Sequence, residues 1–93
     1  MRIIGQIDHP TLKISVFKND NRTSVKFENS VSEITLKMGD DDRFRTVEDI
    51  QRLIDPILLE AVNQQLQAMH TARLAAIARS FPASDASEFE TIL

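Results

Sequence analysis

The spacing of hydrophobic residues changes partway along this chain. Up to about Met38, apolar residues alternate with polar ones, which is the period of a strand with one buried face. From Thr46 onward they recur at steps of three and four, which is the period of an amphipathic helix. The pattern predicts an α+β protein, an antiparallel meander of three to four strands followed by a short and a long helix. The expected strands are residues 2–7, 11–18, 22–28 and 32–38, and the expected helices are residues 46–54 and 56–80.

One set of alternating residues in each of the last three strands is expected to face the core. These residues are Leu12, Ile14 and Val16, then Thr23, Val25 and Phe27, then Ile34, Leu36 and Met38. The strands are separated by Asn19-Asp20-Asn21 and by Asn29-Ser30, and both residue types favour tight turns. Asp8-His9-Pro10 sets the first strand apart, so the sequence leaves open whether that strand joins the sheet.

Both helices have clear starting signals. Thr46 is suited to cap the short helix, with Glu48 in its electropositive first turn. Asp55 fits the N-cap of the long helix, and Pro56 fits its first position, where the missing N–H costs nothing. No further proline follows until Pro82, so the long helix is expected to run from residue 56 to residue 80.

The long helix is longer than the strands it must cover. Twenty-five residues make a rod of roughly 37 Å, whereas a seven-residue strand spans roughly 23 Å. The overhanging part, residues 71–78, is rich in alanine and other apolar residues, so we predict a homodimer there. The expected interface is Ala68, Met69, Ala72, Arg73, Ala75, Ala76 and Ile77. The competing interpretation is a solvated helix face, on which alanine is common because it is the best helix former.

Composition and charge narrow the class of protein. The 93 residues predict one domain, residues 1–81, followed by a flexible tail, residues 82–93. The chain has no cysteine, which excludes disulfides and thiolate metal sites. Asp8 follows the start too closely for a signal peptide, and no apolar run reaches the roughly 20 residues of a membrane span. We therefore expect a cytoplasmic protein without membrane contact, and its net charge of −3 argues against duplex DNA binding.

No pattern in the sequence indicates catalysis. There is no nucleophile elbow, glycine-rich phosphate loop or HExxH sequence, and neither His9 nor His70 has a partner at metal-binding spacing. The run Asp40-Asp41-Asp42 lacks the alternating ligands, central glycine and closing glutamate of a calcium loop. We expect a non-enzymatic protein without a cofactor or a metal ion.

The outer face of the predicted sheet suggests an alternative function. It carries basic residues and one aromatic residue, a combination that can bind single-stranded nucleic acid by phosphate contact and stacking. The candidate residues are Lys13, Phe17, Arg22, Lys26 and Lys37, with Ser15, Ser24 and Thr35 between them. A solvated face whose lysines discourage edge-to-edge pairing would show the same pattern.

The tail is the last candidate contact. Residues 82–93 are small and acidic until they end in apolar residues, as expected for a spacer with a short docking motif. The candidate docking residues are Phe89, Thr91, Ile92 and Leu93. Equally, these residues could fold back on the core or on the dimer seam. The sequence as a whole predicts a protein-interaction module, a dimeric adaptor, regulatory or assembly subunit that binds another protein through the long helix or the tail.

Overall fold

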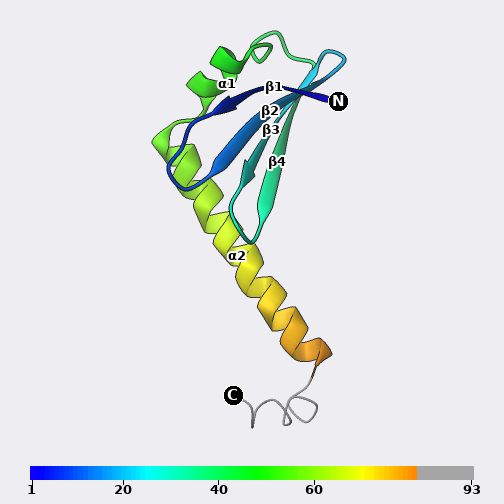
Figure 1. Cartoon of the computed structure of the whole chain (residues 1–93), viewed down its shortest axis with the longest axis vertical. Coiled ribbons are helices and arrows are strands. Elements are labelled where there is room, and N and C mark those ends of the chain that lie inside the picture. The colour runs from blue at the N-terminus through cyan, green and yellow to red at the C-terminus, as the bar shows by residue number, and fades with distance from the viewer. Residues whose placement is uncertain (82–93) are drawn as a thin grey trace.

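A computed structural model of the chain describes residues 1–81 and has the predicted α+β arrangement. Four strands come first and two helices follow (Figure 1). The strands are β1 (Arg2–Ile7), β2 (Lys13–Asn19), β3 (Arg22–Glu28) and β4 (Glu33–Gly39). The helices are α1 (Val47–Leu53) and α2 (Pro56–Ser80). Each boundary lies within about two residues of its expected position, a usual margin for element ends.

The sheet is an antiparallel meander in the order β1-β2-β3-β4. β1 does join it, as an edge strand paired with β2, with an irregularity between Ile3 and Gly5. Both predicted asparagine-rich turns are present. Asp20 adopts a positive φ of 58°, and the Oδ1 of Asn29 accepts hydrogen bonds from the backbone N–H groups of Val31 (2.9 Å) and Ser32 (2.8 Å). The bonds to Asn29 help to fix the register of the β3–β4 hairpin, and the conformation of Asp20 closes the β2–β3 hairpin.

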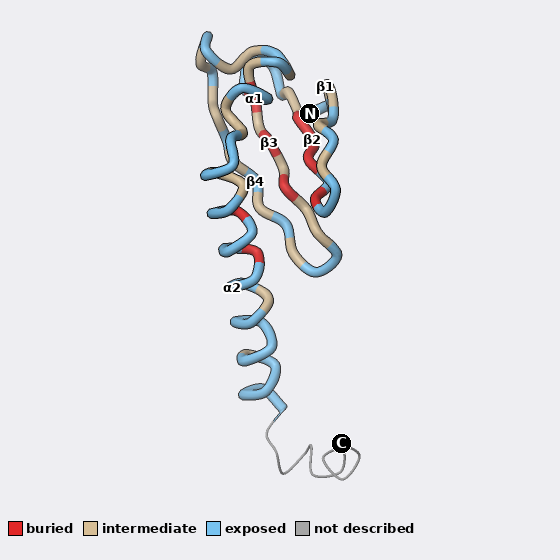
Figure 2. The backbone as a smooth tube through the Cα atoms, turned by 90° about the vertical axis from the view of Figure 1, so that its left-hand side faces the viewer, coloured by how far each residue is buried: buried red, intermediate tan, exposed pale blue. Residues whose placement is uncertain are grey.

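Both helices lie on the same face of the sheet (Figures 1 and 2). The core is therefore a single layer of side chains between that face and the helices. Its buried members are Leu12, Ile14, Val16, Val25, Phe27, Ile50, Val62 and Leu66. Only the first half of α2 contributes, through Val62 and Leu66, so the second half of that helix adds nothing to the core.

The helix starts form as the sequence predicts. Thr46 and Asp49 make a capping box, in which each side chain accepts a hydrogen bond from the backbone N–H of the other residue. Asp55 caps α2 by accepting from the backbone N–H of Leu58 at 2.8 Å, with Pro56 in the first turn. The caps set where α2 begins and hence how far it extends past the sheet.

Candidate functional site

Arg73 marks the place where α2 leaves the sheet. Its Nη1 donates a hydrogen bond to the carbonyl oxygen of Val31 in the β3–β4 turn at 2.9 Å, and its Nη2 lies 2.8 Å from the Nδ1 of His70. Residues 74–80 continue the helix beyond that turn, and Figures 1 and 2 show no other described element beside them. The overhang therefore begins after Arg73, slightly later than the expected residue 71.

The sheet-facing side of α2 stays apolar along this overhang. Leu66 is fully buried, and steps of four, four, three and four residues lead onward to His70, Leu74, Ile77 and Phe81. At 100° per residue, Ile77 lies about 20° from the direction of Leu66, whereas Phe81 and Leu74 lie about 60° and 80° from it, toward one flank. Leu74, Ile77 and Phe81, here called the apolar ridge, are 53%, 48% and 62% exposed. A stripe that packs in the core at Leu66 thus continues into solvent, and exposed large apolar side chains in a row mark interaction sites.

The predicted interface residues do not all lie on one side of α2. All are exposed except Ala76, which is half-buried. At 100° per residue, Arg73 and Ile77 share the side of Leu66, Met69 and Ala76 lie on one flank, and the other alanines point away from the sheet. These last residues are Ala68, Ala72 and Ala75. The prediction omitted Leu74 and Phe81, although counting onward from Leu66 in steps of three and four identifies both.

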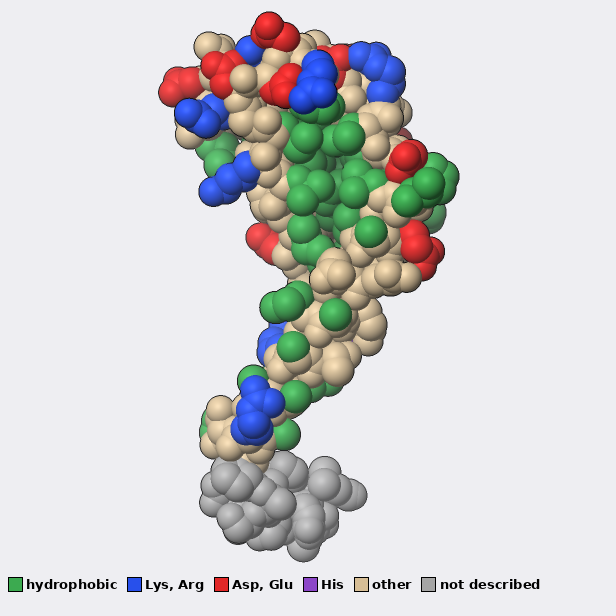
Figure 3. Space-filling model, turned by 180° about the vertical axis from the view of Figure 1, so that it is seen from behind, with side chains coloured by type: hydrophobic (Ala, Val, Ile, Leu, Met, Phe, Trp, Pro, Cys, Tyr) green, Lys and Arg blue, Asp and Glu red, His purple; other side chains and the backbone are tan. Residues whose placement is uncertain are grey.

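A second apolar surface lies on β4. Ile34, Leu36 and Met38, here called the β4 strip, face the helices and pack against the core but stay half-exposed. The reason is that β4 is an edge strand, while the fully buried side chains belong to β2 and β3. Figure 3 shows hydrophobic side chains gathered on the helix-bearing face of the molecule, with charged residues around the upper end. The β4 strip leaves part of the sheet's inner face open.

Among residues 1–81, no helix lies over the outer face of the sheet, and this face brings part of the predicted basic set together. Lys26 Nζ lies 5.5 Å from the centre of the Phe17 ring, a cation–π contact, and 3.7 Å from Glu28 Oε1. Arg22 and Lys37 line a common hollow of about 280 Å³. Lys13 lies at the other end of β2. The five candidates therefore form a partial patch that Glu28 interrupts.

Ser15 departs from the expectation of a fully solvated outer face. It is only 1% exposed. Its cross-strand neighbours are Gln6 and Lys26, whose long side chains flank the small hydroxymethyl group. The centre of the outer face is thus partly covered by its own side chains, which reduces the polar surface that a ligand can reach.

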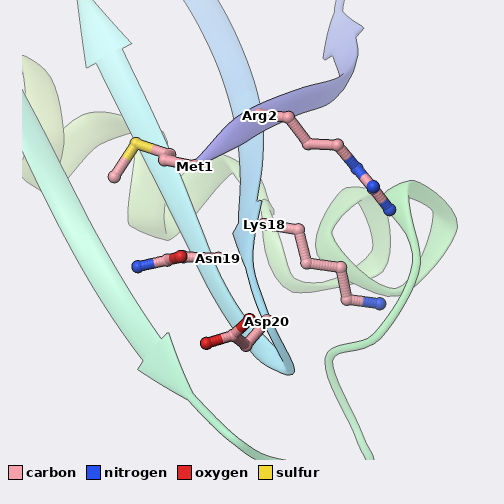
Figure 4. A pocket seen from close by; sticks show the side chains of 5 residues that line it. All are labelled: Met1, Arg2, Lys18, Asn19 and Asp20. Carbon is pink, nitrogen blue, oxygen red and sulfur yellow. The ribbon is translucent and has the colours of Figure 1, made fainter.

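A further hollow, of about 270 Å³, lies beside the β2–β3 turn and is lined by Met1, Arg2, Lys18, Asn19 and Asp20. Figure 4 shows Arg2 and Lys18 pointing to one side of the strand and Asn19 and Asp20 to the other, so these groups do not converge. Lys18 Nζ also donates to the carbonyl oxygen of Arg45 at 3.0 Å. This hollow lacks the convergent polar groups of a ligand site.

The acidic run Asp40-Asp41-Asp42 forms ion pairs with Arg43 and Arg45. Arg45 Nη2 lies 2.5 Å from Asp40 Oδ1 and 2.7 Å from Asp42 Oδ1, while its Nη1 donates to the carbonyl oxygen of Asn21 at 2.7 Å. Arg43 binds Asp41 with two nitrogens, and this hydrogen bonding lowers the pKa of Asp41 to about 2. The run therefore fastens the loop before α1 to the β2–β3 turn.

The histidines also have structural partners. His9 Nδ1 accepts hydrogen bonds from the backbone N–H groups of Thr11 (3.1 Å) and Leu12 (3.2 Å), which closes the β1–β2 turn. His70 contacts Arg73 as described above. Within residues 1–81, no group of three or more His, Asp or Glu side chains gathers to hold a metal ion. The predicted tail contacts, Phe89, Thr91, Ile92 and Leu93, lie outside the described residues.

Comparisons with protein-family models, with curated proteins and with solved structures gave no match for this chain. Neither α1 nor α2 combines the length and hydrophobicity that crossing a bilayer requires. The candidate functional surfaces of residues 1–81 are therefore the apolar ridge, the β4 strip and the outer face of the sheet.

Proposed function

We propose that this protein acts by binding rather than by catalysis, as a cytoplasmic homodimeric interaction module with the contact in the C-terminal half of α2. The single observation that supports this is the apolar ridge, which continues the buried stripe of Leu66 past the end of the sheet. Exposing three large apolar side chains of a projecting helix to water is unfavourable, and covering them lowers the free energy. A second copy offers the same surface.

Helix energetics support the same proposal. A helical segment without tertiary contacts is only marginally stable in water, because most helical stability in proteins comes from packing of an apolar face. Residues 74–80 nevertheless continue α2 by about two turns beyond Arg73. Contact with another chain would supply the packing that the sheet does not give this segment.

Light scattering over a concentration series tests the proposal. The chain has a mass of 10.5 kDa, and we expect twice that mass at micromolar concentrations, falling toward the single-chain value on dilution. A mass of one chain throughout, up to high micromolar concentration, would rule out the homodimer. Replacing Lys13, on the far side of the sheet, with Gln provides a matched control that should leave the mass unchanged.

The dimer is proposed to serve as an adaptor, regulatory or assembly subunit, with the tail as a second contact. Deleting residues 83–93 separates two roles for that segment. Lower thermal stability of the deletion variant would mean that the tail packs on its own protein. Unchanged stability with loss of a bound partner in native cell extract would mean that the tail docks.

Single-stranded nucleic acid is the second candidate ligand. The observation in its favour is that the outer face is free of helices and holds Lys26 over the ring of Phe17, with Arg22 and Lys37 nearby. A labelled oligonucleotide should then bind more weakly as salt is raised, and Phe17→Ala should weaken it further. Absence of binding at low salt would dismiss this candidate without affecting the dimer.

A further inference from the structure

The apolar ridge and the β4 strip have complementary positions in the fold. The ridge lies between the sheet-facing side of α2 and one flank of the helix, beyond the end of its own sheet. The β4 strip lies on the helix-facing side of the sheet and is half uncovered. In each chain, therefore, the apolar ridge of α2 has no sheet to pack on, and the β4 strip is not completely covered by a helix. A twofold axis along the sheet normal would place the overhang of one copy in the same layer as α2 of the other, with its ridge toward the partner's sheet.

Charge along α2 selects the direction of the partner helix. From residue 61 to residue 81 the chain has no acidic residue, and its two arginines are Arg73 and Arg79. Glu60 and Asp55 lie at the opposite end of the helix. An antiparallel pair places the basic end of each helix beside the acidic start of the other. A parallel pair would place like charges side by side and would also bring the like ends of the two helix dipoles together.

Surface area favours contact with the sheet over contact between helix tips alone. Met69 and the three ridge residues are 48–62% exposed, and each leaves on the order of 100 Å² uncovered. Two copies therefore bring roughly 800 Å² from these side chains, less than the roughly 1,200–2,000 Å² that stable interfaces bury. Covering the partly exposed β4 strip as well adds apolar area and brings the total toward the lower end of that range.

We infer that the second copy binds antiparallel, with residues 74–80 of one α2 lying beside residues 59–65 of the other and the apolar ridge against the partner's β4 strip. This inference rests on the proposed homodimer and adds its geometry. The end of each α2 that holds Arg79 then lies beside the end of the other that holds Glu60, and the twofold axis passes near Met69 and His70. The contact is isologous, so it closes on two copies and does not propagate.

Distances between spin labels test this geometry, because the chain has no cysteine of its own and single cysteines can be introduced at exposed positions. The variants are Thr71→Cys near the proposed axis, and Ser80→Cys and Ile57→Cys near the two helix ends. At 1.5 Å per residue, we expect labels within about 20 Å of each other at residue 71. The corresponding separations are roughly 30 Å at residue 80 and roughly 40 Å at residue 57.

The other profiles overturn the inference in distinguishable ways. Short distances at all three positions would mean a parallel pair, and a short distance only at residue 80 would mean tip-to-tip contact. Either result leaves the homodimer in place and removes the antiparallel geometry. Absence of any distance between copies, together with a single-chain mass, would remove the homodimer itself.

Charge reversal gives an independent check on the register. Arg79→Glu and Glu60→Arg should each raise the dimer Kd roughly tenfold at low salt, because the twofold axis creates two repulsive contacts from one substitution. The double variant should return the Kd close to that of the unchanged protein. A double variant whose dimer is weakened by as much as the two single substitutions together would contradict the proposed proximity of these two helix ends.

Discussion

The guanidinium group of Arg73 binds the carbonyl oxygen of Val31 at 2.9 Å, across 42 positions of sequence. This bond joins α2 to the turn between β3 and β4 at the lower end of the sheet. It anchors α2 at a second place, beyond the core contacts of Val62 and Leu66, at the point from which the rest of the helix projects. The surface proposed for dimerisation begins directly after this bond.

Loss of this bond should loosen the end of α2 without unfolding the protein. Arg73→Met keeps the aliphatic bulk but removes both hydrogen bonds, which we expect to cost about 1 kcal/mol because the site is exposed. Amide hydrogen exchange at residues 74–80 should become severalfold faster, while exchange in β2 and β3 stays the same. Arg73→Lys keeps one donor and should be intermediate. Unchanged exchange in Arg73→Met would show that the bond does not hold the helix.

Gly5 is required by the close approach of α1 to β1. A Cβ atom at Gly5 would lie 2.6 Å from Val47 Cγ2, inside the contact distance of two carbons. Gly5→Ala should therefore lower the free energy of unfolding by about 1–3 kcal/mol through overpacking. The double variant Gly5→Ala/Val47→Ala makes room for the new methyl group. In chemical denaturation it should lose less stability than the sum of the losses measured for the two single variants. Strict additivity would contradict the contact.

Thr23 carries a hydroxyl that the fold does not use. Its Oγ1 is buried and has no hydrogen-bond partner among residues 1–81, and the residue is 0% exposed. Thr23→Val replaces the hydroxyl with a methyl group of similar shape and should stabilise the protein by about 1 kcal/mol. Thr23→Ser, which keeps the hydroxyl and loses the methyl group, should be destabilised in the same thermal melts. A lower melting temperature for Thr23→Val would mean that the hydroxyl is satisfied.

Asp41 should make the folding stability of the protein decrease as the pH falls into the acid range. Hydrogen bonds from Arg43 hold its folded-state pKa at about 2, below the ordinary value near 3.9. A lowered pKa contributes stability above the unfolded value, and that contribution is lost as the pH falls from about 4 through about 2. Asp41→Asn should therefore be less stable than the unchanged protein at pH 7, and the difference should vanish near pH 2. An equal difference in denaturant midpoint at both pH values would argue against this pairing.

The sequence predicts those features that local residues determine. Thr46 and Asp55-Pro56 specify the helix starts, because caps involve only neighbouring residues, and alternation in β2 to β4 specifies which residues face the core. The sequence left open whether β1 joins the sheet, because Asp8-His9-Pro10 separates it from β2, with which it pairs. The close approach of Gly5 in β1 to Val47 in α1 joins residues 42 positions apart. Packing between distant elements leaves no periodic signal.

The candidate surface was predicted only in part for the same reason. The length of α2 correctly indicates an overhang, but the side that the overhang presents depends on which stripe meets the sheet. The expected interface includes Met69, which is 58% exposed, but it leaves out Leu74 and Phe81, and it includes Arg73, which binds the β3–β4 turn. The half-open β4 strip depends on where α2 crosses the sheet, which no local pattern encodes.

Sedimentation equilibrium of Ile77→Asp against the unchanged protein tests the central claim most directly. Ile77 lies in the middle of the apolar ridge, makes no contribution to the buried core and is 48% exposed, so a charge there should leave the fold intact. We expect the unchanged protein to sediment as a dimer and Ile77→Asp as a monomer, with the same far-ultraviolet circular dichroism. Lys13→Gln, on the outer face of the sheet, should remain a dimer. Equal self-association of the unchanged protein and Ile77→Asp would contradict the proposal that the apolar ridge forms the dimer contact.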